Sequence, residues 1–80
     1  MSSAVETTDH EKIKEWAESR GGHPAQVKGT GGLLRIDFGE PNEGLERISW
    51  EDFFQQFDQS KVKFLYSPEK ENKFNKFVRD

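Results

Sequence analysis

Four aromatic residues lie on one side of a predicted helix near the middle of the chain, and they restrict the fold more than any other feature. Their spacing of i, i+3, i+4 and i+7 is that of an amphipathic helix with one apolar face. Only 31% of the 80 residues are hydrophobic but 12% are aromatic, and each aromatic side chain buries roughly 150–250 Å². We therefore predict that this face is core rather than a platform for sugars or peptides. The four residues are Trp50, Phe53, Phe54 and Phe57.

A second amphipathic pattern predicts a helix closer to the N-terminus. Thr8 and Glu11 have the spacing of a capping box, in which each side chain bonds to the backbone amide of the other residue. Gly21 is the residue type that ends helices in a left-handed conformation. We expect a disordered tail over residues 1–7 and one domain over residues 8–80. The apolar stripe of this helix consists of Ile13, Trp16 and Ala17.

Alternating apolar and polar residues predict short strands around the two helices. The last of them, 74–78, is compatible with a strand or a short helix, and we favour a strand because it would close a hairpin with 61–66. The sequence thus predicts an α+β fold of two layers, with two helices packed on one face of a small antiparallel sheet, in the order α-β-β-β-α-β-β. The predicted strands are 25–28, 33–38, 45–48, 61–66 and 74–78, and Ser49 with Asp52 is predicted to cap the second helix.

A glycine-rich segment, residues 20–32, holds five of the seven glycines. One hypothesis is an anion-binding loop, with backbone amides as donors and Lys28 and Thr30 beside them. The segment lacks the Gly-Lys-Ser/Thr signature of a P-loop, and a strand rather than a helix follows it. We therefore interpret Gly29 to Gly32 as a hairpin turn. Why this turn holds three glycines, and whether it binds a ligand, stays open at this point.

Several classes of chemistry are excluded or disfavoured by composition. The chain has no cysteine, which excludes disulfides and thiolate catalysis and favours a reducing, cytoplasmic location. Its N-terminus has no signal-peptide pattern and its apolar runs are only two or three residues long, so no membrane segment is expected. We expect a monomer.

Metal binding and catalysis are also not expected. The only imidazoles, His10 and His23, flank a helix that would separate them by ~18 Å, too far to share a metal ion. The carboxylate pairs at 9/11 and 51/52 are explained by helix capping, and no serine has a nucleophile-elbow context. The sequence therefore predicts a protein that is not an enzyme and has no cofactor and no metal site.

The C-terminal quarter carries an excess of positive charge. Residues 1–60 hold six Lys and Arg against twelve Asp and Glu, or −6, whereas residues 61–80 hold six against three, or +3. Basic residues that alternate with aromatic ones are typical of single-stranded nucleic-acid binding by stacking. The same pattern also fits an ordinary hairpin with rings inside and lysines outside. The candidate surface comprises Lys61, Lys63, Lys73, Lys76 and Arg79, with Lys28 and Thr30 of the turn, and its rings are Phe64, Tyr66, Phe74 and Phe77.

The resemblance of this chain to other proteins rests on the segments 8–30, 34–38 and 48–57, together with 64–66 and 74–78. These segments resemble a family of short bacterial proteins with no established biochemical function. Members often carry the description 1,4-alpha-glucan branching enzyme. A branching enzyme resembles a TIM-barrel amylase, and such a barrel needs ~250 residues, so the resemblance implies no branching activity and brings no catalytic residues. A role associated with glucans is the most that the description implies. The resemblance covers nearly the whole chain beyond the tail.

The sequence leaves three hypotheses for function. The first is a small non-catalytic cytosolic interaction module that presents the glycine-rich turn and the surface beside it to a protein partner. The second is a single-stranded nucleic-acid binder that uses the 61–79 hairpin. The third and weakest is a glucan-associated protein that binds through exposed rings.

Overall fold

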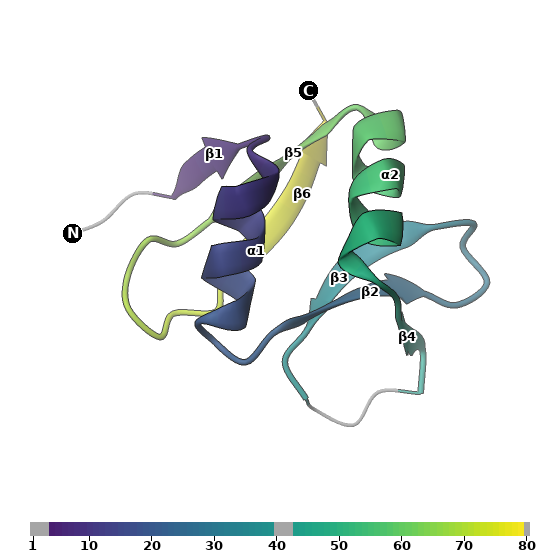
Figure 1. The fold of residues 1–80 in the computed structure, drawn as a ribbon, viewed down its shortest axis with the longest axis horizontal. Helices are drawn as coiled ribbons and strands as arrows, with labels where there is room; N and C mark the ends of the chain where they lie inside the picture. Colours follow the sequence, from purple (N-terminus) through teal and green to yellow (C-terminus); the bar gives the residue numbers. More distant parts are fainter. Residues whose placement is uncertain (1–3, 40–42, 80) are drawn as a thin grey trace.

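The computed structural model describes residues 4–39 and 43–79. Over these ranges the protein has an α+β fold with two helices and two three-stranded antiparallel sheets (Figure 1). One sheet has the strand order β1-β5-β6 and the other β3-β2-β4. In chain order the elements are β1 (Val5–Thr7), α1 (His10–Glu18), β2 (His23–Val27), β3 (Leu33–Asp37), β4 (Leu45–Arg47), α2 (Trp50–Ser60), β5 (Val62–Tyr66) and β6 (Asn75–Arg79).

The predicted single sheet is therefore wrong, because the strands form two separate sheets. Strands β2, β3 and β4 pair with one another before the chain enters α2. Strands β5 and β6 form a hairpin after α2, which confirms the strand favoured at 74–78. The β3-β2-β4 sheet is therefore formed by three consecutive strands, whereas the other sheet joins β1, from before α1, to β5 and β6.

The predicted N-terminal tail is also wrong at Val5–Thr7, which form the short strand β1. β1 pairs with β5 in antiparallel register, with Thr7 opposite Phe64 and Val5 opposite Tyr66. Valine and threonine favour strands, and without β1 one edge of β5 would lack a pairing partner. Residues 1–3 of the predicted tail lie outside the described residues.

The ends of the helices follow simple capping chemistry, with one correction. The N-cap of α1 is Asp9 rather than the predicted Thr8, and its carboxylate accepts hydrogen bonds from the amides of Glu11 and Lys12. Gly21 has a φ of 73°, and the adjacent Gly22 amide donates to the carbonyl of Ala17 at 2.8 Å, as expected for a glycine-terminated helix. Ser49 caps α2 as predicted and accepts from the amide of Asp52.

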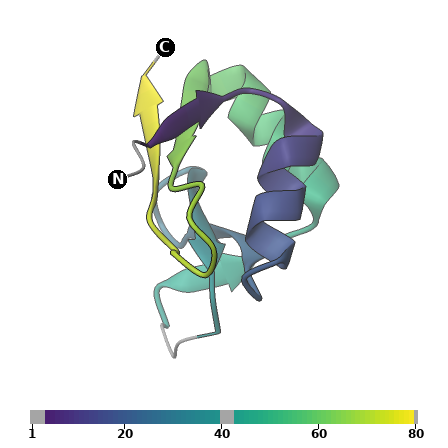
Figure 2. The same ribbon diagram turned by 90° about the vertical axis from the view of Figure 1, so that its left-hand side faces the viewer.

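The core is built mainly from aromatic rings. Phe53 and Phe57 of α2 are buried, as the helical spacing predicted, whereas Trp50 and Phe54 are half-buried and pack against the core from outside. Figure 2 shows α1 across the interior from β5 and β6, and α2 packs against β2 and β3. The other buried members are Ile13, Trp16 and Ala17 of α1, Leu34 and Ile36 of β3, and Phe64 of β5.

Trp16 joins the two sheets across this core. Its ring packs edge-on against Phe64 of β5, with 5.4 Å between the ring centres. It packs in the same way against Phe38, just after β3, with 6.1 Å between the centres. Its indole N–H donates a buried hydrogen bond of 2.7 Å to the carbonyl of Ser67. Arg20 covers the Trp16 ring at 4.5 Å and donates to the carbonyls of Glu69 and Asn72. These contacts fix the loop between β5 and β6 to the end of α1.

The importance of the ring core can be tested with Phe53→Ala. Truncating a fully buried phenylalanine to alanine lowers the unfolding free energy by about 3–5 kcal/mol. That loss is as large as the ~3–5 kcal/mol of stability that a core of this size supplies. We expect this variant to show no cooperative urea transition when followed by circular dichroism. The matched control is Phe74→Ala, because Phe74 is 49% exposed and its loss should change the unfolding free energy by only about 0.5 kcal/mol. A Phe53→Ala transition with the parent midpoint would contradict this account of the core.

Candidate functional site

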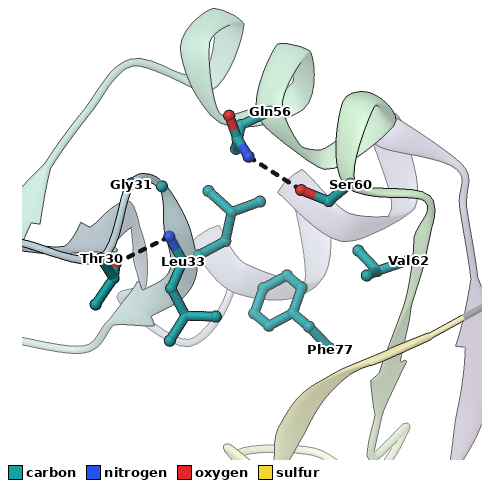
Figure 3. Close-up of a pocket in the computed structure, with 9 residues that line it drawn as sticks. Thr30, Gly31, Leu33, Gln56, Ser60, Val62 and Phe77 are labelled. Carbon is teal, nitrogen blue, oxygen red and sulfur yellow. Dashed lines mark hydrogen bonds between the residues drawn. The ribbon is translucent and has the colours of Figure 1, made fainter.

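A pocket of about 240 Å³ lies where the two sheets meet, and we take it as the candidate functional site (Figure 3). Three parts of the chain form it: the glycine-rich turn with the start of β3, the C-terminal half of α2, and the β5–β6 hairpin. Because these segments are distant in sequence, the pocket depends on the packing of the whole domain. Its lining residues are Thr30, Gly31, Gly32, Leu33, Leu34, Gln56, Ser60, Val62 and Phe77.

The floor of the pocket is apolar and its rim is polar. Leu34 is buried, Val62 and Phe77 are half-buried, and Leu33 is 47% exposed at the mouth. Figure 3 shows Gln56 and Ser60 of α2 above Val62 and Phe77, with the Gln56 side-chain amide donating to the Ser60 hydroxyl at 3.0 Å. A small apolar surface ringed by a few polar groups is the usual composition of a binding pocket.

The conformation of the turn explains its three glycines. Gly29, Gly31 and Gly32 all have positive φ, at 76°, 76° and 115°, where other residues are strained. Thr30 stabilises the turn, because its hydroxyl donates to the carbonyl of Val27 at 2.6 Å and accepts from the amide of Leu33 at 3.1 Å. The turn interpretation of 29–32 is confirmed, and each of its glycines has a conformational reason.

Gly32 also leaves room for the end of the Gln56 side chain, which reaches the turn from α2. A Cβ atom at this position would lie 2.9 Å from the side-chain amide carbon of Gln56, closer than real Cβ contacts. Gln56 does not belong to the apolar face that the spacing of α2 defines, yet it is half-buried and the end of its side chain lies against the turn. The spacing of apolar residues along α2 identifies only the face that packs on the core. It could not show that the glycine-rich turn contacts another side of the helix, so Gln56 and Ser60 were not predicted as site residues.

The predicted site residues divide into three groups. Thr30 lines the pocket, whereas Lys28, Lys61 and Arg79 do not. They are its neighbours in the chain or across the hairpin: Lys28 precedes the turn, Lys61 separates Ser60 from Val62, and Arg79 is opposite Val62. Lys63 and Lys76 lie on the outer face of the β1-β5-β6 sheet, in register with Val78 and Leu65. The Lys73 ammonium lies 5.5 Å from the centre of the Phe38 ring.

The rings of the hairpin point mostly inward. Phe64 is buried, and the rings of Tyr66 and Phe77 pack against it. The ring centres are 5.7 Å apart for Tyr66 and 5.3 Å apart for Phe77. This arrangement matches the prediction that rings and lysines occupy opposite faces. Phe74 is the exception, because it is exposed and lies just before β6.

The ionisable groups with clear partners serve the scaffold rather than the pocket. The pKa of Asp37 is lowered, first by a hydrogen bond from the amide of Gly39 and then by one from the Arg47 guanidinium at 3.0 Å, which ties β3 to β4. His10 lies 2.9 Å from the Asp58 carboxylate and stacks on Phe54, which joins α1 to α2. Within residues 4–39 and 43–79, no three His, Asp or Glu side chains are close enough together to bind a metal ion.

Neither described helix is both long and apolar enough to cross a membrane. No protein-family model, curated protein sequence or solved structure matches this chain. The pocket is therefore interpreted from its own geometry and chemistry.

The close approach of the turn to α2 can be tested with Gly32→Ala and the matched variant Gly29→Ala. Both substitutions put a side chain at positive φ, which costs about 1–2 kcal/mol at the near-αL angle of Gly29 and more at the φ of 115° of Gly32. Only the side chain at position 32 also meets the end of the Gln56 side chain. We expect urea denaturation to show that Gly32→Ala lowers the unfolding free energy more than Gly29→Ala does. Adding Gln56→Ala should recover part of the difference. If Gln56→Ala recovers none of the loss that Gly32→Ala causes, the proposed contact is contradicted.

Proposed function

We propose that this protein is a small, monomeric, non-catalytic module of the cytoplasm that binds a protein partner, one apolar side chain of which enters the pocket. The observation that carries the proposal is the apolar pocket itself, open to solvent beside the half-exposed Leu33. Such pockets are where interfaces place their strongest anchor residues. The absence of cysteine supports the cytoplasmic location.

The size of the pocket favours a side chain over a free small molecule. At about 240 Å³ it is smaller than the ~300–1,000 Å³ typical of small-molecule sites. It is larger than the ~150 Å³ cavity that is known to accept benzene. One aromatic or branched aliphatic side chain therefore matches the available volume.

The chemistry of the lining supports binding rather than catalysis. None of the nine lining residues is ionisable, so the pocket contains no general acid or base. The two hydroxyls already have partners, since Thr30 bonds to the turn backbone and Ser60 accepts from Gln56. Without an adjacent base neither hydroxyl is activated as a nucleophile.

Nucleic-acid binding is a second candidate, and the observation that favours it is the exposed ring of Phe74, two residues before Lys76 in the chain. The packing weakens this candidate, because Phe77 contacts Phe53 and Phe57 in the core and Tyr66 stacks on Phe64. A glucan-binding role, as the family resemblance implies, would need the same exposed rings. Both alternatives therefore rest on a single well-exposed aromatic ring of the hairpin.

The proposal is tested by nuclear magnetic resonance titration of the nitrogen-15-labelled protein with a tripeptide blocked at both ends, Ac-Gly-Phe-Gly-NH2. We expect saturable shifts of the Gly31, Leu33, Ser60 and Val62 amides with a dissociation constant near a millimolar, or about −4 kcal/mol. The alanine peptide Ac-Gly-Ala-Gly-NH2 should produce none. Leu33→Ser should weaken binding several-fold, whereas Leu65→Ser, on the outer face of the other sheet, should not.

Two further ligands distinguish the alternatives in the same spectra. An oligothymidylate that shifts Leu65, Phe74 and Lys76 while the phenylalanine peptide shifts nothing would replace the proposal with nucleic-acid binding. Shifts produced by maltohexaose alone would favour the glucan role.

A further inference from the structure

We propose that the pocket binds the C-terminal residue of a partner chain, with its apolar side chain inside and its α-carboxylate at the glycine-rich turn. This inference rests on the proposed function, because it specifies which part of a protein partner occupies the same pocket. It follows from two features of the chain around the pocket: turn amides with no acceptor among the described residues, and basic residues that neighbour lining residues in the chain or across the hairpin.

The unused donors are the amides of Gly31 and Gly32, which belong to the pocket wall. The amide of the next residue, Leu33, donates to the Thr30 hydroxyl. For Gly31 and Gly32, no acceptor is found among the residues that the structure describes. Successive backbone amides of a turn are donors that bind anions, including terminal carboxylates.

The positive charge comes from Lys28, Lys61 and Arg79, which flank the pocket in the chain or across the hairpin. All three are exposed, and within residues 4–39 and 43–79 none of them has an ion-pair partner. No carboxylate lines the pocket to oppose an incoming anion. A ligand with a single negative charge next to an apolar group is therefore complementary to the rim and the floor together.

A C-terminal residue has this combination of groups. Its side chain and its α-carboxylate leave the same Cα atom, so both can reach a small pocket and the turn that forms its wall. An internal segment of a partner has the side chain but not the charge. An acidic side chain has the charge but not the apolar group. The pocket therefore fits a chain end with an apolar last residue, such as phenylalanine or leucine.

The test compares two ligands that differ only in the terminal group, Ac-Gly-Phe-OH and Ac-Gly-Phe-NH2, by titration of the labelled protein at low salt and neutral pH. We expect the free acid to bind about tenfold more tightly, because charge-assisted hydrogen bonds are stronger than neutral ones. Its amide-proton shifts should be largest at Gly31 and Gly32. The advantage of the acid should shrink as salt is added.

Charge variants of the protein complete the test. The double variant Lys28→Gln/Lys61→Gln should remove most of the advantage of the free acid without changing the affinity for the amide. The control Lys73→Gln should leave the advantage unchanged, because that lysine lies over Phe38 and not at the pocket. Lys61→Arg should retain it.

The possible failures are distinguishable. Equal affinities for the acid and the amide would overturn the carboxylate assignment and leave the proposed pocket function intact. If neither ligand binds, and Ac-Gly-Phe-Gly-NH2 also fails, both the inference and the proposed function are wrong. An advantage of the acid that survives in the Lys28→Gln/Lys61→Gln variant, with no shift at Gly31 or Gly32, would also overturn the inference.

Discussion

The structure depends on aromatic packing between two sheets that are not joined by a backbone ladder. Trp16 touches the β3 side through Phe38 and the β5 side through Phe64, and Phe77 packs against Phe53 and Phe57 of α2. Backbone hydrogen bonds fix the strands within each sheet, but ring contacts set how one sheet sits against the other. Because the chain has few aliphatic residues, a small number of large aromatic side chains holds the two sheets together.

The pocket lies at the margin of this packing. Phe77 belongs to the ring cluster on one side and to the pocket on the other, so the wall of the candidate site is also part of the core. The glycine-rich turn completes the pocket because Gly32 can approach Gln56 without a Cβ atom between them. The candidate site therefore requires no element beyond those that fold the domain, and its apolar character is that of a core surface left partly uncovered.

The helices, their ends and the C-terminal hairpin could be predicted because each depends on residues that are close together in the chain. The aromatic spacing of α2, the Ser49 cap, the Gly21 helix end and the β5–β6 hairpin were confirmed. The division into two sheets was missed, since alternation identifies a strand but not its partner. β1 was missed because three residues give too short a pattern. Of the pocket residues, the turn residues Thr30, Gly31 and Gly32 and the ring of Phe77 belonged to predicted binding segments. Leu33, Leu34, Gln56, Ser60 and Val62 were missed, because a pocket between distant segments has no signature along the chain.

The central claim is that the junction pocket, and not the outer face of the hairpin, is where a partner binds. Isotope-filtered nuclear Overhauser measurements on the labelled protein with bound Ac-Gly-Phe-OH test it most directly. We predict contacts from the ligand ring to the methyl groups of Leu33, Leu34 and Val62, which line the pocket. Contacts instead to the methyl groups of Leu65 and Val78, which are in register with the outward lysines, would contradict the claim.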